Sequence, residues 1–213
     1  MLDKIYILGA GGFGRELLQW IKDINDVKET WEIGGFLDDD LHALDGVACD
    51  YRIEGTISEW QPKHDEVFAL GIASAEFKKK VTSLIKGKGG KFTDVIHPTA
   101  MLSGFAEHGE GLVMFPYSKL SCNSKVGKFV TILSSPIGHD TVIGDYTVIS
   151  GNCNIVRNVV IGEEVFLAAG VCIAQDVHIG DGAYLGLGAV ILKDVEPGAV
   201  MFGNPARKMP KEK

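Results

Sequence analysis

A six-residue period runs through the second half of this sequence and restricts its fold more than any other feature. A bulky residue, usually aliphatic, recurs at every sixth position from Leu102 onward, with a shift of one residue between Ile132 and Ile137. Small or β-branched residues stand two positions before most of them, and glycine often follows. The recurring positions are Leu102, His108, Met114, Leu120, Val126, Ile132, Ile137, Ile143, Ile149, Ile155, Ile161, Leu167, Ile173, Ile179, Leu185 and Ile191.

A sustained hexapeptide period is the sequence signature of a parallel β-helix. Each hexapeptide supplies one short strand and one corner, three hexapeptides close a triangular coil, and the aliphatic residue fills the interior. A β-sandwich would instead place its strands at irregular spacings of about 8–12 residues. The segment 107–117 fits the period poorly, because His108 occupies a position that should be aliphatic. We therefore expect a loop or a distorted strand there and give His108 no chemical role.

The first 95 residues have a different pattern. Apolar runs predict strands at 4–8, 32–37, 67–70 and 91–96, and helical spacing predicts helices at 13–24 and 75–86, the second capped by Ser74. Strands that alternate with helices imply a small, Rossmann-like parallel α/β sheet. The sequence thus predicts an α/β domain over residues 1–95 and an all-β domain, the β-helix, over residues 96–213.

Composition excludes several classes of protein. The formal net charge of −7 argues against nucleic acid or an anionic membrane surface as the main partner. No apolar run is long enough for a transmembrane helix, and the first residues lack the features of a signal peptide. We expect a cytoplasmic protein without membrane insertion, whose four cysteines are buried thiols, and their spacing predicts no metal site.

Three glycines, Gly9, Gly11 and Gly14, form a G-x-G-x-x-G motif between the first strand and the first helix. Asp38 and Asp39 follow the second strand, where carboxylates can accept hydrogen bonds from a ribose or a base. The motif alone suggests an NAD site. However, the domain is only half a dinucleotide-binding fold and shows no residues for hydride transfer. A structural turn without a ligand is a further possibility.

Several segments together carry a family resemblance. The run from Ile137 to Tyr146 and the ending Gly203–Arg207 resemble the left-handed β-helix acyltransferases. The opening Gly9–Glu16, the segment Gly35–Asp39 and the run Ile96–Ala100 narrow this further. The chain resembles, over nearly its whole length, the sialic acid O-acetyltransferase-like (NeuD/PglD-like) family of bacterial sugar acyltransferases. The resemblance implies a homotrimer that transfers an acetyl group from acetyl-CoA to a bacterial surface sugar, often one linked to a nucleotide.

The resemblance also assigns roles to individual residues. His139 would be the general base, because a histidine can take a proton near neutral pH, and Asp140 would orient its imidazole. Direct attack on the thioester would need no acyl-cysteine. Acetyl-CoA would contact Val148, Ala169 and Leu187. By their charge alone, and not by the resemblance, Arg207 and Lys208 near the C-terminal end could meet its phosphates. The nucleotide of the sugar substrate would bind a set of loop residues of the first domain: Gly12, Phe13, Gly14, Asp38, Asp39 and Gly71.

The sequence departs from the family pattern at five places. Val148 and Phe13 stand where many relatives have histidine, and Arg157 stands where a glycine is usual. Gly138 occupies a position that is acidic in some amino-sugar enzymes, and the segment 133–136 is one residue short. Most of these changes lie at positions that would surround the acceptor and the acetyl group. The sequence therefore does not identify the sugar or the nucleotide of the substrate.

The leading interpretation is an acetyl-CoA-dependent N-acetyltransferase that acts on a nucleotide-linked amino sugar in bacterial surface-glycan biosynthesis. The alternatives are O-acetylation of a sialic acid-type sugar and a non-catalytic trimeric sugar-nucleotide-binding protein. A metal-binding β-helix of the carbonic anhydrase kind would need three converging histidines. Only His139 and His178 lie well inside the regular repeat.

Overall fold

The computed structural model describes residues 2–210 and divides after Pro98 into two compact units. We call them unit 1 and unit 2 and describe each by itself. The sequence pattern places the division after residue 95. Among residues 2–210, no helix has the length and apolar character needed to cross a membrane.

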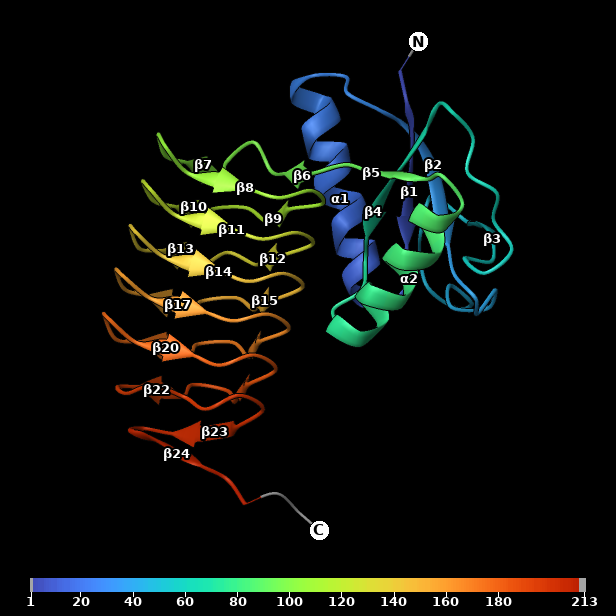
Figure 1. The fold of residues 1–213 in the computed structure, drawn as a ribbon. Helices are drawn as coiled ribbons and strands as arrows, with labels where there is room; N and C mark the ends of the chain where they lie inside the picture. Colours follow the sequence, from blue (N-terminus) through green and yellow to red (C-terminus); the bar gives the residue numbers. More distant parts are fainter. Residues whose placement is uncertain (1, 211–213) are drawn as a thin grey trace. The chain divides into compact units, whose positions relative to one another are not determined.

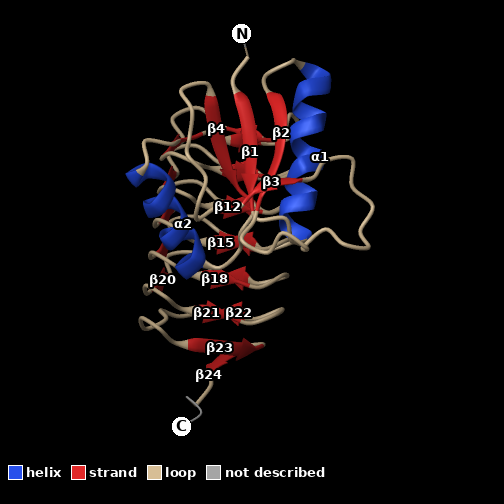
Figure 2. Ribbon diagram, turned by 90° about the vertical axis from the view of Figure 1, so that its right-hand side faces the viewer, coloured by secondary structure: helices blue, strands red, loops and turns tan. Residues whose placement is uncertain are grey.

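Unit 1 contains a five-stranded, wholly parallel sheet with the strand order β3-β2-β1-β4-β5. Its strands are β1 (Lys4–Leu8), β2 (Glu32–Leu37), β3 (Ile53–Gly55), β4 (Glu66–Leu70) and β5 (Lys91–Phe92). The helices are α1 (Gly12–Val27) and α2 (Ala75–Gly87), and a short strand β6 (Val95–Ile96) follows. Figure 2 shows β4, β1 and β2 side by side. This confirms the predicted Rossmann-like architecture.

The apolar runs of the sequence form the core of unit 1. β1 is the central strand, and Ile5, Ile7 and Leu8 are fully buried. Helix α1 buries Leu17, Leu18 and Ile21, which recur at helical spacing on one face. Ser74 caps α2 as predicted, since its hydroxyl accepts a hydrogen bond from the backbone N–H of Phe77. The sequence analysis missed β3, a three-residue edge strand.

Unit 2 is a parallel β-helix, as the hexapeptide period predicts, and Figure 1 shows its coils stacked one on another from β7 to β23. One face contains β7 (Met101–Leu102), β10 (Lys119–Leu120), β13 (Pro136–Ile137), β16 (Asn154–Ile155), β19 (Cys172–Ile173) and β22 (Val190–Ile191). The second contains β8 (Glu107–His108), β11 (Lys125–Val126), β14 (Val142–Ile143), β17 (Val160–Ile161) and β20 (His178–Ile179). The third contains β9 (Val113–Met114), β12 (Thr131–Ile132), β15 (Val148–Ile149), β18 (Phe166–Leu167), β21 (Tyr184–Leu185), β23 (Val200–Gly203) and β24 (Ala206–Lys208).

The three corners of the coil are marked by residues with positive φ, a conformation that glycine, asparagine and aspartate tolerate best. Corner A, between the first and second faces, consists of Phe105, Asn123, Asp140, Asn158 and Asp176. Corner B, between the second and third faces, consists of Gly111, Phe129, Tyr146, Glu164, Gly182 and Gly198. Corner C, between the third and first faces, consists of Tyr117, Ser134, Asn152, Gly170 and Gly188.

The recurring aliphatic residues point inward, and each of them from Met114 to Ile191 is buried. The expectation for segment 107–117 was wrong. β8 and β9 pair in regular register with the next coil, and Val113 and Met114 are buried. Leu102 and His108 are exposed, and both lie in the first coil, where no preceding coil covers them.

The missing residue of the repeat is absorbed next to corner C. Ser134 and Ser135 form the shortened turn, and the buried hydroxyl of Ser135 donates to the carbonyl oxygens of Leu133 and Ser150. The same hydroxyl accepts a hydrogen bond of 2.9 Å from the backbone N–H of Cys153. Coil stacking is thereby preserved on both sides, with Leu120 paired to Ile137 and Ile137 to Ile155.

The cysteine expectation needs a correction. Cys153 is buried, but Cys122 and Cys172 are exposed and Cys49 is half-buried. In the β-helix the reason is strand alternation: Cys172 directly precedes the inward-facing Ile173, so its own side chain points outward.

Candidate active site

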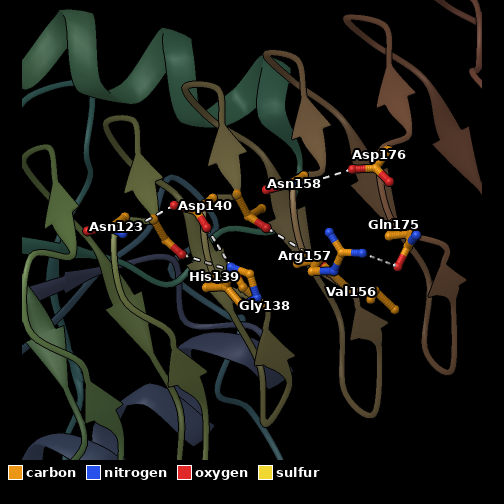
Figure 3. Close-up of polar contacts among 11 residues, drawn as sticks. Asn123, Gly138, His139, Asp140, Val156, Arg157, Asn158, Gln175 and Asp176 are labelled. Carbon is orange, nitrogen blue, oxygen red and sulfur yellow. Dashed lines mark hydrogen bonds and ion pairs between the residues drawn. The ribbon is translucent and has the colours of Figure 1, made fainter.

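His139 lies two residues after the end of β13, where the first face meets corner A. Its Nδ1 atom is 2.5 Å from the Oδ2 atom of Asp140, the next residue in the chain. Both side chains are about half exposed, at 48% and 45%. In Figure 3 the two side chains point toward each other on the outside of the corner. The residues predicted to be base and orienting acid therefore lie in contact, on a surface that a substrate can reach.

Asp140 is fixed from a second side by Asn123, the equivalent corner residue of the preceding coil. The Nδ2 atom of Asn123 donates to Asp140 Oδ1 over 3.2 Å, and the backbone N–H of Asp140 donates to the carbonyl of Cys122. The hydrogen bonds from His139 and Asn123 lower the pKa of the Asp140 carboxyl below its ordinary value. Asp140 is therefore an anion throughout the pH range in which histidine titrates. Sequence reasoning missed Asn123. It could have been found because it occupies the position in the preceding coil that corresponds to Asp140.

The second ring nitrogen of His139, Nε2, has no hydrogen-bond partner among the described residues. With Nδ1 bound to a carboxylate, Nδ1 carries the proton of the neutral imidazole and Nε2 is the basic nitrogen. The residue before His139 is Gly138, and a Cβ atom there would lie 2.6 Å from the carbonyl carbon and oxygen of Val156. Glycine is required at this point because the two coils approach so closely.

Arg157 and Gln175 follow His139 along the same edge, one and two coils further on, and lie to its right in Figure 3. The Nη2 atom of Arg157 donates to Gln175 Oε1 over 2.9 Å, so the guanidinium points along the edge away from His139. Among residues 2–210 no carboxylate forms an ion pair with it. Asn158 and Asp176 repeat the Asn–Asp contact of the corner over 3.0 Å.

Corners A and B differ in whether their outward backbone N–H groups have hydrogen-bond acceptors within the protein. At corner B, side chains of the next coil cover them: the N–H of Lys128 donates to Asp145 Oδ1 and that of Glu163 to Asp181 Oδ1. At corner A, the N–H groups of His139, Arg157 and Gln175 have no acceptor within the described part of the chain. Corner A thus presents a row of donors to a ligand, whereas these corner B donors are internally satisfied.

The residues predicted to contact acetyl-CoA lie elsewhere on the β-helix. Ala169 and Leu187 directly precede the corner C residues Gly170 and Gly188, and Leu187 is 72% exposed. Val148 belongs to β15 on the third face and is only 3% exposed. One chain therefore does not bring these residues together with His139, because corners A and C are different edges of the coil.

In unit 1, three of the predicted glycines have a packing role. A Cβ atom on Gly14 would lie 1.9 Å from the carbonyl oxygen of Gly9, and one on Gly71 would lie 2.7 Å from the Cα atom of Gly14. Gly9 itself has a φ of +102°. The turn between β1 and α1 thus packs backbone against backbone beside the end of β4, which accounts for these positions without a ligand.

The remaining predicted residues of unit 1 differ in their surroundings: some border open space, and others already accept hydrogen bonds from the protein. A Cβ atom on Gly11 would meet nothing within 4 Å, and one on Gly12 would meet only the Arg15 guanidinium, so the turn is open there. Phe13 is half-buried. Asp38 accepts from the backbone N–H groups of Ala10 and Asp40, over 2.7 and 2.9 Å. Asp39 accepts from that of Ser58. Asp38 thus ties the loop after β2 to the turn after β1, and Asp39 ties it to the segment after β3.

The described residues contain no group of three His, Cys, Asp or Glu side chains placed to hold a metal ion. His178 lies on β20, where its ring is 3.8 Å from Asp194 Oδ1. Its position on the second face separates it from His139 at the end of the first.

Comparison with known proteins gives matches in both units. Residues 4–85 match the family described as the PglD N-terminal domain. Residues 158–193 match the family described as bacterial transferase hexapeptide (six repeats).

Three relatives describe the similarity over longer stretches. GDP-perosamine N-acetyltransferase of Escherichia coli O157:H7 is 29% identical over 157 residues, which cover 70% of this chain and 68% of that protein. The acetyltransferase domain of PglB from Neisseria gonorrhoeae, solved in complex with acetyl coenzyme A, is 26% identical, with a TM-score of 0.88 and coverage of 98% and 100%. WeeI from Acinetobacter baumannii is 29% identical, with a TM-score of 0.85 and coverage of 96% and 99%.

Proposed function

We propose that this chain, an acyltransferase homologous to GDP-perosamine N-acetyltransferase and to the acetyltransferase domain of PglB, acetylates the amino group of a nucleotide-linked amino sugar with acetyl-CoA as donor. The product would enter bacterial surface-glycan biosynthesis. The observation that carries the proposal is the His139–Asp140 pair, exposed at corner A with Nε2 of His139 unengaged.

The proposed reaction needs one base. The acceptor amine attacks the thioester carbonyl carbon, a C–N bond forms, and the carbonyl oxygen becomes an oxyanion. His139 Nε2 takes the proton that the nitrogen must lose. The tetrahedral intermediate then breaks its C–S bond, and the departing thiolate of CoA takes the proton from His139. Asp140 holds the imidazole in the required tautomer and balances its transient positive charge.

The oxyanion needs hydrogen-bond donors that are already in place. We assign this role to the backbone N–H of Arg157, one coil below His139. A Cβ atom at position 138 would lie 2.8 Å from this nitrogen, so Gly138 leaves it accessible. The absence of an internal acceptor for this N–H supports the assignment.

A homotrimer would complete the site. His139 lies at corner A, whereas Ala169 and Leu187 lie beside corner C of the same chain. Closed threefold symmetry can bring corner A of one copy to corner C of the next, three times over. Acetyl-CoA would then bind between two copies. The nucleotide of the acceptor would bind unit 1 at the open turn around Gly12 and Phe13, where α1 begins and a helix N-terminus favours an anionic group.

The test is an assay of thiol release from acetyl-CoA with nucleotide-linked amino sugars as acceptors, in separate GDP, UDP and dTDP series. We expect turnover with one series and a product acetylated at nitrogen, identified by mass spectrometry and NMR. Free and CMP-linked sialic acids serve as hydroxyl acceptors. Acetylation of these alone would replace the N-acetyltransferase with an O-acetyltransferase. Nucleotide binding without turnover on any acceptor would favour the non-catalytic alternative.

A further inference from the structure

We infer that Cys122, which lies one coil before His139 on corner A, is a second acetyl acceptor: when no sugar amine is present, its thiol takes the acetyl group from the donor by thioester exchange. The inference rests on the proposed function, because it takes acetyl-CoA as the donor and His139 as the base. The proposed transfer to the sugar needs no acyl-cysteine, so the exchange is a separate reaction of the same site.

Cys122 occupies the same place in its coil as His139 does in the next coil. Leu120 pairs with Ile137, and Cys122 and His139 each lie two residues after these strand ends. The residues that follow them have φ values of +58° and +56°, so the chain turns in the same way. The carbonyl oxygen of each accepts a hydrogen bond of 3.1 Å from the corner residue of the following coil. The two side chains therefore leave the corner at equivalent points.

Side chains at equivalent places in neighbouring coils are in contact along this edge. Arg157 and Gln175 occupy this place two and three coils after Cys122, and their side chains share a hydrogen bond of 2.9 Å. The corner residues that follow Cys122 and His139 are also in contact, over 3.2 Å (Figure 3). Neighbouring coils are separated by the strand spacing of ~4.8 Å, which puts the Cβ atoms of Cys122 and His139 about 5 Å apart. The thiol thus lies within reach of the imidazole.

The thiol of Cys122 is open to a reactant. Cys122 is exposed, and its sulfur atom has no hydrogen-bond partner within residues 2–210. The adjoining imidazole of His139 is also exposed, and its Nδ1 atom is bound to Asp140, which leaves Nε2 to accept a proton. A nucleophile, a base and an acid that orients the base therefore lie next to one another. This arrangement activates a thiol for acyl transfer.

The exchange needs no reactant other than the donor. His139 Nε2 takes the thiol proton, and Cys122 Sγ forms a bond to the thioester carbonyl carbon. The bond between this carbon and the sulfur of CoA then breaks, and the CoA thiolate takes the proton from His139. Because one thioester replaces another, the free-energy change is small and excess CoA reverses the step. A sugar amine forms an amide instead, which is more stable than a thioester, so it withdraws the acetyl group permanently.

Cys172 is the matched control within the same chain. It is also exposed, but its neighbours in the adjacent coils are Asn154 and Val190, and neither side chain can take a proton. Its thiol is directed toward the carbonyl oxygen of Gly170. Exchange that depends on solvent access alone would modify both exposed thiols, whereas exchange that needs a base would modify Cys122.

The experiment incubates the full chain with acetyl-CoA that is isotopically labelled in the acetyl group, without any sugar, and follows the intact mass over time. Peptide mass spectrometry after digestion at low pH locates the label. Neutral hydroxylamine removes an acetyl group from a thiol but not from a lysine. The variants are Cys122→Ala, Cys172→Ala and His139→Ala. Thermal unfolding checks that each variant folds, and calorimetry measures its affinity for CoA.

We expect Cys122 to be acetylated about 10²-fold faster than Cys172, because only Cys122 adjoins a base. Added CoA should remove the label. Cys172→Ala should be labelled at the rate of the unaltered chain, whereas Cys122→Ala should lose the label that hydroxylamine removes. His139→Ala should slow the acetylation of Cys122 by about 10²-fold while it still binds CoA.

Three results would overturn the inference in a chain that acetylates a sugar amine, and they leave the proposed function intact: no label at Cys122, equal labelling of Cys122 and Cys172, or undiminished labelling in His139→Ala. Acetylation of Cys122 by a chain that acetylates no sugar amine would keep the inference and remove the proposed acceptor. A chain that binds no CoA and acetylates neither sugar nor thiol would remove both.

Discussion

The imidazole of His139 and the carboxylate of Asp140 share a hydrogen bond of 2.5 Å although the two residues are consecutive in the chain. In an extended strand, neighbouring side chains point to opposite sides. Asp140 has a φ of +56°, which turns its side chain back toward His139 at the corner. The corner of the β-helix thus builds the base–acid pair from local backbone geometry, and Asn123 of the preceding coil fixes it.

Replacement of His139 tests the proposed base. We expect His139→Ala to lower kcat about 10²–10⁴-fold, the usual contribution of general-base catalysis, with CoA affinity little changed. Steady-state kinetics and calorimetry separate the two effects. His178→Ala is the matched control, because His178 is also exposed near an aspartate but lies on the second face. Undiminished acetyl transfer by His139→Ala would remove the assigned role.

The partners of His139 should matter in a graded way. We expect Asp140→Asn to lower kcat/KM by roughly 10–100-fold, since the carboxylate that fixes the imidazole is lost. Asn123→Ala should cost less, because Asp140 keeps its contact with His139. Kinetics of both variants at one pH provide the measurement. A larger loss in Asn123→Ala than in Asp140→Asn would contradict this order.

The decrease of kcat/KM toward low pH should reflect the protonation of one group. The pKa of Asp140 is lowered by its hydrogen bonds to His139 and Asn123. The Asp140 carboxylate would therefore lose its negative charge only when the pH falls below the ordinary carboxyl range of about 4. Above that range Asp140 keeps its charge, so it should add nothing to the pH dependence. We expect log kcat/KM to fall with a slope of one as pH decreases, and a slope of two would show that Asp140 also titrates there.

The sequence predicted the architecture well because each unit has a clear period. The six-residue repeat determines the interior of unit 2 from Met114 to Ile191, and the helical spacing in 13–24 places α1. The sequence-based predictions were wrong or incomplete where the sequence shows no clear period. β3 is too short to show one. The expected irregularity at His108 did not occur, because backbone pairing between coils does not require an aliphatic side chain.

The site was predicted less completely, because a linear pattern does not show which edges of a prism adjoin. His139 and Asp140 were found as neighbours in sequence. Asn123 was missed, since its contact with Asp140 spans a coil. Ala169 and Leu187 were grouped with His139 by resemblance, but they lie at another corner of the same chain. In unit 1 the glycine motif suggested a ligand, whereas Gly9, Gly14 and Gly71 also pack against one another.

Gly138 should tolerate no side chain. Alanine there would place its Cβ atom 2.6 Å from the backbone of Val156, so the coils must separate locally. We expect Gly138→Ala to cost about 1–3 kcal/mol of unfolding free energy and roughly 2–10 °C in Tm, with a loss of kcat as His139 shifts. Gly104→Ala is the control, because a Cβ atom at that position meets nothing within 4 Å. Equal Tm values for the two variants would contradict the packing argument.

The turn between β1 and α1 offers a test of structural against ligand-binding glycines. In Gly14→Ala the new Cβ atom would lie 1.9 Å from the Gly9 carbonyl oxygen, which is backbone and cannot move aside cheaply. We expect a loss of about 3 kcal/mol or more in the stability of unit 1. Gly11→Ala should be nearly neutral, because position 11 has open space and a φ of −64°. The three tryptophans of the chain, Trp20, Trp31 and Trp60, all lie in unit 1, so their fluorescence during thermal unfolding follows this unit. If Gly11→Ala unfolds as early as Gly14→Ala, packing at Gly14 is not what requires the glycine. If Gly14→Ala unfolds first but keeps nucleotide affinity at low temperature, its role is structural, and the ligand contacts are confined to the open part of the turn.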